Sequence, residues 1–412
     1  MSSAGPGEAA AIDEPELYFT GGLLRVASAR HTGDSSSSSS GKNSRESFLK
    51  SFQWCPDGCS ALTSSEDGWL QVWQMPDQSL LRATLYYKHL RTAEEGNGDS
   101  SSGAARGVLS PSLQVSAGEA VYDCKWLPCA SSSDSRSYRF AATSRDLPIN
   151  LHDATTGVII CSYRGHNHMD ELDPATSIAF NPSGERLYAG SNRMIKCFDV
   201  SCPRSYSSMP TSSTRRDPLG QKGLLSCLAF SPDASGAYAA GSYGGSIGLY
   251  VEDMEGCALE LRDVGFGVSC VRWSPDGGLL YAGGRRCDDI VCWDVRHTRR
   301  ELGRCRRQCS SNQKMSFDLD PWGRALIAGG QDGSLRVYDA GSFELLSCDV
   351  GGECANSVAV HPYCALLGVA RGQRHFADSS SDSDSEEAGT GRGRQPRRAP
   401  ESCVELYSFG VK

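Results

Sequence analysis

Seven prolines recur along the chain, each in a predicted turn between two short apolar stretches, and this repetition constrains the fold more than any other feature. They are Pro56, Pro128, Pro182, Pro232, Pro275, Pro321 and Pro362. The later intervals settle to 43, 46 and 41 residues, and a repeat of roughly 40–45 residues is typical of a β-propeller blade. One blade cannot bury both of its faces, so the repeats must stack around a ring. The sequence therefore predicts an all-β, seven-bladed β-propeller of WD repeats.

The clearest repeat unit is 267–296, where an alternating strand ends at a proline–glycine turn and two further apolar strands follow. Proline fixes φ in such a turn, and glycine supplies a positive φ. The other six units are 48–74, 120–153, 176–199, 224–250, 313–339 and 354–376. An aspartate follows the third strand in several units, and we expect it to accept backbone N–H groups of the next turn: Asp153, Asp199, Asp294 and Asp339. Tryptophans recur at strand positions and are expected in the core: Trp54, Trp126, Trp273 and Trp293.

The seventh unit is interrupted by a polar insert at 377–400, and a last apolar strand follows it. We expect the segment 16–30 to supply the closing strand of this last blade, because it is the remaining unassigned apolar piece and closure removes open sheet edges. The propeller would then span 48–412. Disorder is expected in polar segments that are poor in aromatic residues: the acidic 1–15, the serine-rich linker 31–47, and the inserts 93–107 and 377–400. Serines beside acidic residues are candidate phosphorylation sites, with a merely solvated insert as the alternative: Ser379, Ser380, Ser381, Ser383 and Ser385.

The composition excludes several classes of function. The net charge is −8 and the 18 cysteines include no C-x-x-C pair, so we expect free thiols in a reducing compartment, no metal site and no cofactor. No Walker loop, G-x-S-x-G elbow or H-E-x-x-H motif occurs, which predicts a non-catalytic protein without a small-molecule substrate. We find no secretory leader and no apolar run near the ~18 residues that cross a bilayer. The chain is expected to be a monomeric propeller with no membrane contact.

Charges sort by loop type. In a blade of four strands, a to d, the b–c and d–a loops lie on one face of the ring and the a–b and c–d turns on the other. The a–b and c–d turns carry many acidic residues, whereas the b–c and d–a loops carry many arginines, Arg307 and Arg371 among them. The sorting has exceptions on both sides: Arg186, Arg204 and Arg296 on the acidic side, and Asp170, Glu171 and Asp288 on the basic one. We call the candidate RNA-binding residues on these loops the basic rim: Arg145, Asn167, His168, Arg193, Tyr243, Arg285, Arg286, Asn312, Gln313, Lys314, Gln373 and Arg374.

Single-stranded RNA requires such a mixture of groups. Cations follow the phosphates, planar groups stack on bases and amides read base edges. The alternative is that these residues are ordinary solvated loop charges. The concentration of cations on one face of an acidic protein favours the nucleic-acid interpretation for the set as a whole.

From Phe48 to about Phe376, and again at the last strand, the chain resembles the telomerase Cajal body protein family. The specific motifs are NHMDEL at 167–172, GSYGGSIGLY at 241–250, SNQKMSFDLDP at 311–321 and GQRHF at 372–376. The resemblance implies a WD-repeat propeller that binds H/ACA-type small Cajal body RNAs and telomerase RNA through a short loop motif, the Cajal body box. It also implies H/ACA ribonucleoprotein and telomerase ribonucleoprotein partners and a nuclear location in Cajal bodies, with a cytoplasmic pool left open.

A second interpretation rests on 293–296, where Trp-Asp-Val-Arg fits the W-D-x-R pattern of propellers that dock on cullin ubiquitin-ligase adaptors. The pattern is weak, because Trp-Asp also belongs to ordinary blade grammar. It predicts a protein-interaction scaffold in which Arg296 contacts the adaptor.

Overall fold

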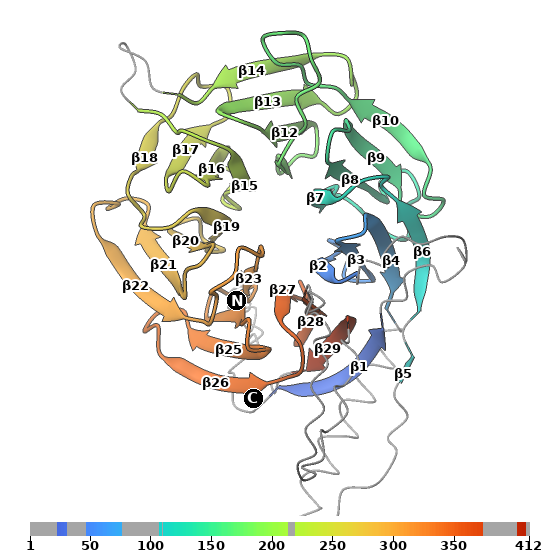
Figure 1. Ribbon diagram of the computed structural model, residues 1–412, viewed down its shortest axis with the longest axis vertical. Coiled ribbons are helices and arrows are strands. Elements are labelled where there is room, and N and C mark those ends of the chain that lie inside the picture. Colours follow the sequence, from blue (N-terminus) through green and yellow to red (C-terminus); the bar gives the residue numbers. More distant parts are fainter. Residues whose placement is uncertain are drawn as a thin grey trace, which may run out of the picture.

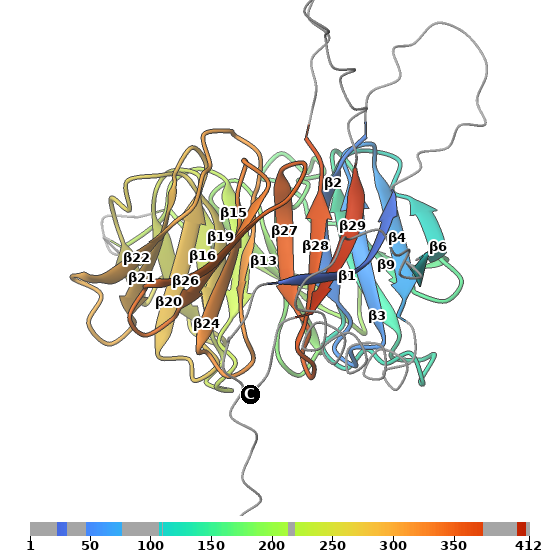
Figure 2. The same cartoon turned by 90° about the horizontal axis from the view of Figure 1, so that it is seen from below.

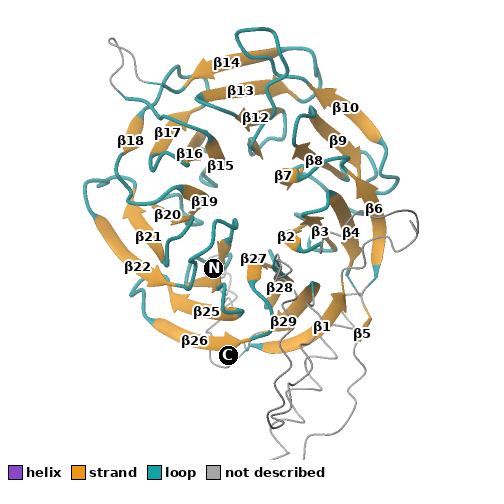
Figure 3. Ribbon diagram, viewed as in Figure 1, coloured by secondary structure: helices purple, strands orange, loops and turns teal. Residues whose placement is uncertain are grey.

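The computed structural model describes residues 23–30, 47–75, 107–108, 110–212, 219–373 and 402–408. Strands are the regular secondary structure in these ranges, and they form seven sheets arranged in a ring (Figure 1). Figure 3 shows that short loops join them, with no helix in the described part of the chain. The predicted seven-bladed propeller is therefore confirmed. With no helix there, the described chain also holds no helix long and apolar enough to cross a membrane.

Six blades contain four antiparallel strands each, and their bounds follow. Blade 1 has β2 (Leu49–Trp54), β3 (Ser60–Ser65), β4 (Trp69–Gln74) and β6 (Pro111–Ser116). Blade 2 has β7 (Val121–Trp126), β8 (Arg139–Ser144), β9 (Ile149–Asp153) and β10 (Ile159–Tyr163). Blade 3 has β11 (Ser177–Phe180), β12 (Arg186–Gly190), β13 (Met194–Asp199) and β14 (Tyr206–Pro210). Blade 4 has β15 (Leu225–Phe230), β16 (Ala237–Ser242), β17 (Ile247–Val251) and β18 (Leu259–Leu261). Blade 5 has β19 (Val268–Trp273), β20 (Leu279–Gly284), β21 (Asp289–Asp294) and β22 (Glu301–Arg306). Blade 6 has β23 (Phe317–Leu319), β24 (Ala325–Gly329), β25 (Ser334–Asp339) and β26 (Leu345–Val350).

Blade 7 joins the two ends of the chain. It contains β27 (Ala355–Val360), β28 (Leu366–Arg371), β29 (Cys403–Ser408), β1 (Leu24–Arg30) and the short β5 (Gly107–Val108), in that order. β1 pairs antiparallel with β29, from Leu24 opposite Ser408 to Arg30 opposite Cys403. This confirms that an N-terminal strand closes the ring.

The bounds predicted for the closing strand and the disordered segments fall only partly on described residues. Residues 16–22 of the expected closing strand lie outside them. So do 1–15, 31–46, 93–106 and 377–400, and with them all five candidate phosphorylation sites. Gly107, the last residue of the expected insert, belongs to β5 and pairs with Ala27.

Tryptophans link neighbouring blades through the core. Trp54, Trp126 and Trp273 each end the innermost strand of a blade, and each is at most 8% exposed. Each indole N–H donates to a backbone carbonyl of the preceding blade: Ala359 (2.9 Å), Gln53 (3.4 Å) and Ala229 (3.0 Å), respectively. The core positions predicted for these residues and for Trp293 are confirmed.

The turns also behave as their sequences predict. Gly277 has φ of 71° in the a–b turn of blade 5, a region that residues with a Cβ rarely adopt. The four aspartates after the third strands accept backbone N–H groups: Asp153 from Thr156 (2.8 Å), Asp199 from Ser201 (2.7 Å), Asp294 from Arg296 (2.9 Å) and Asp339 from Ser342 (2.7 Å). These carboxylates therefore hold the c–d turns.

Candidate nucleic-acid interface

The b–c turns lie against the d–a segments on one face of the ring. Figure 2 shows the strands crossing the thickness of the ring, so the chain reverses direction at its two faces. Backbone hydrogen bonds tie the two kinds of loop together: Arg145 N–H to Ala120 O (3.1 Å), Arg193 N–H to Gly223 O (3.0 Å), Tyr243 N–H to Leu224 O (3.0 Å), Arg285 N–H to Gly267 O (2.9 Å) and Arg286 N–H to Ser311 O (3.1 Å). These five rim residues of blades 2 to 5 therefore share a face.

Tyr243 and Arg285, from the b–c turns of adjacent blades, form a stacked pair. The guanidinium carbon of Arg285 lies 3.5 Å from the ring centroid of Tyr243, and Nη2 donates to the tyrosine hydroxyl at 2.6 Å. Arg285 Nε is buried and has no hydrogen-bond partner among the described residues. The contact orients a planar cation. Planar groups of this kind are surfaces on which unstacked RNA bases can lie.

Asn167 organises the loop between blades 2 and 3. Its side-chain oxygen accepts the N–H groups of Met169 (2.8 Å) and Glu171 (3.0 Å), and its amide nitrogen donates to Glu171 Oε2 at 3.1 Å. The Asn167 amide therefore makes its hydrogen bonds within its own loop, whereas the neighbouring His168 is exposed. The predicted role of Asn167 in reading a base would require these bonds to rearrange.

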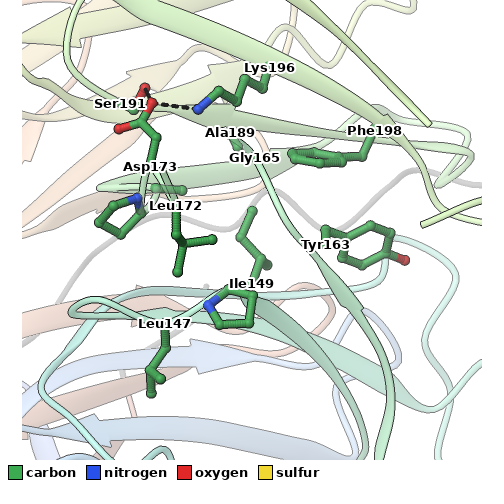
Figure 4. Close-up of a pocket in the computed structure, with 13 residues that line it drawn as sticks. Leu147, Ile149, Tyr163, Gly165, Leu172, Asp173, Ala189, Ser191, Lys196 and Phe198 are labelled. Carbon is green, nitrogen blue, oxygen red and sulfur yellow. Dashed lines mark hydrogen bonds and ion pairs between the residues drawn. The ribbon is translucent and has the colours of Figure 1, made fainter. Parts of the chain in front are cut away.

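The same loop is anchored at its end by a buried ion pair, shown in Figure 4. The Lys196 ammonium, on β13, contacts the Asp173 carboxylate, which also accepts the Ser191 hydroxyl at 2.7 Å. Lys196 is 2% exposed. The small cavity around the pair lies between blades 2 and 3. The pair therefore fixes the loop that presents His168.

The rim residues of blades 6 and 7 approach the central channel. Gln313 donates to Asn356 Oδ1 at 2.6 Å, so its amide is also engaged, whereas Asn312 is exposed. Lys314 Nζ donates to the carbonyl of Ser226, in blade 4, at 3.4 Å. Burial is the largest single influence and lowers the pKa of Lys314, but Asp123 and the other groups around the ammonium together outweigh it, so the pKa is raised. Gln373 is half-buried, and Arg374 lies outside the described residues.

Three further cations, which the sequence analysis did not identify, line the same channel. Lys50, Lys125 and Arg272 surround a cavity of about 70 Å³ together with Lys314 and Asp123. They project from the innermost strands of blades 1, 2 and 5, where a cation within a strand is the available sequence signal. Each of the three lies beside a carboxylate, Lys50 by Glu66 (3.0 Å), Lys125 by Asp123 (3.9 Å) and Arg272 by Asp318 (3.2 Å), so their charge is partly compensated.

Two arginines expected among the b–c and d–a loop cations are buried instead, and that expectation was wrong. Arg307 and Arg371 are each 1% exposed. Arg307 donates to the carbonyls of Met315 (3.1 Å) and Gly284 (3.4 Å), and Arg371 pairs with Glu405. Buried charges need such partners, and both residues stabilise the loops rather than face a ligand.

Comparisons with known proteins agree with the repeat fold. The family model "WD domain, G-beta repeat" matches residues 38–74, 157–199 and 261–294. Telomerase Cajal body protein 1 of Bos taurus is 35% identical over 352 residues, which cover 83% of this chain and 61% of the relative. The Rattus norvegicus protein of that name is 33% identical over 385 residues, covering 92% and 68%. The Drosophila melanogaster homolog is 28% identical over 374 residues, covering 89% and 63%. The chain thus spans about three fifths to two thirds of the relatives' lengths, and it belongs to the telomerase Cajal body protein 1 family.

Proposed function

We propose that the protein is a non-catalytic scaffold whose basic rim binds H/ACA-type small Cajal body RNAs and telomerase RNA. The observation that carries this proposal is the arrangement of four arginines on one face of the ring: Arg145, Arg193, Arg285 and Arg286. The backbone N–H group of each donates to a carbonyl of a d–a segment on that face. Exposed cations that share one face of an acidic protein can orient a polyanion by its phosphates. Relatives of this family carry telomerase and the Cajal body in their name.

The rim offers two kinds of contact to a single-stranded RNA loop. The exposed side chains of Arg145, Arg193 and Arg286 supply charge to the phosphates. The stacked Tyr243 and Arg285 supply a planar surface for a base, a contact that contributes ~1–3 kcal/mol per base in such proteins. Lys314 and the channel cations would hold a phosphate that lies near the centre of the ring.

A scaffold of this kind joins its RNA to other proteins. We propose H/ACA ribonucleoprotein proteins and the telomerase ribonucleoprotein as partners, and Cajal bodies in the nucleus as the location. The names of the relatives support the link to telomerase and Cajal bodies.

Cross-linking of the tagged protein in its own cells, followed by sequencing of the bound RNA, tests the proposal. We expect enrichment of H/ACA-type small nuclear RNAs and telomerase RNA, with cross-links concentrated on peptides that contain the rim. Recovery of these RNAs at no more than the level of an untagged control would contradict the proposal.

One observation keeps a second function open, that of a cullin ubiquitin-ligase substrate receptor. The Arg296 side chain is 76% exposed on the c–d face, where its guanidinium also pairs with Asp294 at 3.0 Å. It is therefore accessible to an adaptor protein. Co-purification of a cullin adaptor that is lost on Arg296→Ala would favour this function, and unchanged recovery of the adaptor would count against it.

A further inference from the structure

A groove of about 640 Å³ lies between blades 3 and 4, apart from the basic rim. Strands β12, β13 and β14 form one side, and the c–d turn of blade 4, residues 252–256, forms the other. Figure 1 shows β12, β13 and β14 side by side, with β14 at the outer edge of the ring. The groove therefore offers a surface that RNA held on the rim would leave free.

The floor of the groove is aromatic and contains a polar group without a partner. The rings of Tyr188 and Tyr238 lie 5.0 Å apart, and both side chains line the groove. Tyr238 is 2% exposed, yet its hydroxyl makes no hydrogen bond to any described residue. Burial, together with the nearby Cys197 and Glu252, raises the pKa of Tyr238. Tyr238 lines the groove, and its hydroxyl can both donate to and accept from a ligand bound there.

The wall of the groove is acidic. Glu252, Asp253 and Glu255 follow one another along the c–d turn, and among the lining residues only Arg186 opposes them. Arg186 pairs with Asp253 at 2.7 Å. Glu252 Oε1 accepts the Tyr188 hydroxyl at 3.0 Å, while its Oε2 and the carboxylate of Glu255 accept no hydrogen bond from a described residue. Two carboxylate groups that line the groove with Tyr238 thus retain free acceptor oxygens.

Two methionines provide the apolar surface at the edge of this groove. Met254 is 59% exposed, and Met209 is half-buried, with its sulfur accepting the Gly256 N–H at 3.3 Å. Methionine side chains are flexible and polarizable, so they adapt to the apolar side chain of a partner. An apolar surface next to free carboxylates suits a ligand that carries both an apolar and a cationic group.

We propose that this groove binds an extended segment of a partner protein in which an arginine lies next to an apolar residue. The guanidinium would donate to the Tyr238 hydroxyl and to Glu252 Oε2, and the apolar side chain would pack on Met254 and Met209. Arginine suits this site because its planar fork donates to several acceptors at once. Phosphates are disfavoured here by the carboxylates, so RNA is not the occupant. The proposal is independent of RNA binding at the rim.

Fluorescence anisotropy with a short labelled peptide, Gly-Ser-Leu-Arg-Ala-Arg-Leu-Ser-Gly, tests the proposal on the full chain. The matched peptide carries citrulline in place of both arginines, which keeps the shape and removes the charge. We expect the arginine peptide to bind and the citrulline peptide to bind at least about tenfold more weakly, because hydrogen bonds to charged groups are stronger than neutral ones.

Variants separate the groove from general charge attraction. Tyr238→Phe and Glu252→Gln should each weaken binding of the arginine peptide about tenfold, and Glu255→Gln should weaken its binding less. Glu344→Gln removes an exposed acid from blade 6 and should leave binding unchanged. Tyr238→Phe should not lower the melting temperature, since the hydroxyl has no partner to lose. Absence of binding at about 1 mM peptide, equal binding of the citrulline peptide, or unchanged binding by Tyr238→Phe would each overturn the proposal.

Discussion

Arg371 of β28 and Glu405 of β29 form an ion pair inside blade 7, with side chains only 1% and 5% exposed. Arg371 also donates to the carbonyls of Gly333 (2.7 Å) and Glu353 (3.0 Å). The second oxygen of Glu405 accepts a hydrogen bond from Arg25 of β1 at 2.7 Å. One carboxylate therefore links the strand before the insert, the strand after it and the closing strand from the N-terminal region.

Removing this carboxylate should destabilise the ring much more than removing its outer partner. Glu405→Gln leaves the Arg371 charge buried without compensation, and we expect a loss of about 3–5 kcal/mol in the free energy of unfolding. Arg25→Ala should cost no more than about 1 kcal/mol, because solvent screens its 47% exposed side chain. Urea denaturation of both variants measures the difference. Equal losses would show that Glu405 does not join the strands in this way.

Stability should fall as the pH drops below neutral because of His361. Its Nδ1 accepts the N–H groups of Tyr363 and Cys364, both at 3.0 Å, and its Nε2 lies 3.0 Å from Gly58 O. Burial lowers the pKa of His361 in the folded protein. The unfolded chain therefore binds the proton more readily, so this stability is present above about pH 6.5 and is lost as the pH falls below it.

Denaturation between pH 7.5 and 5.5 tests this expectation. The free energy of unfolding that one histidine contributes cannot fall by more than about 1.4 kcal/mol per pH unit. The total decrease over this pH range should be smaller in His361→Gln than in the unmodified protein. Some dependence should remain, because burial also lowers the pKa of His152. An identical pH dependence in His361→Gln would contradict the assignment.

Phe48 precedes β2 and is 5% exposed, packed beside Gly372. Truncation leaves a cavity between the first and last blades, so Phe48→Ala should cost about 3–5 kcal/mol. Tyr363, which is 64% exposed, supplies a matched control, and Tyr363→Ala should change stability by no more than about 0.5 kcal/mol. Thermal or urea unfolding compares the two. A near-neutral Phe48→Ala would mean that blade 1 does not close against blade 7 as described.

Local features of the fold could be predicted from the sequence because each is set within a few residues. Proline–glycine turns, the aspartate after the third strand and the tryptophan that ends the first strand all act inside one blade or between neighbours. The closing strand was also predictable, since the last blade lacked a strand and few apolar segments remained. Pairings between distant residues were not predictable. Arg371 finds Glu405 across the insert, so its burial could not be read from its position in an apparent b–c loop.

The candidate site shows the same division. Loop order alone placed Arg145, Arg193 and Arg285 on one face. The stack of Arg285 on Tyr243 joins residues in different blades, and its geometry follows from blade packing rather than from either turn. The side-chain amides of Asn167 and Gln313 likewise form hydrogen bonds whose partners could not be identified from the sequence.

The central claim is that the b–c and d–a face binds RNA, and two charge-reversed proteins test it most directly. Arg145→Glu with Arg193→Glu changes two exposed arginines of the basic rim, whereas Arg299→Glu with Arg300→Glu changes two exposed arginines of a c–d turn. Both pairs alter the net charge equally. The probe is a labelled H/ACA-type hairpin that carries a Cajal body box loop.

The decisive measurement is the dissociation constant of this hairpin as a function of salt concentration. We predict that the rim variant binds at least about tenfold more weakly, with a salt dependence shallower by about 0.7 per lost phosphate contact, while the c–d variant binds like the unmodified protein. Equal weakening of the two variants, or no weakening of the rim variant, would contradict the claim that this face holds the RNA.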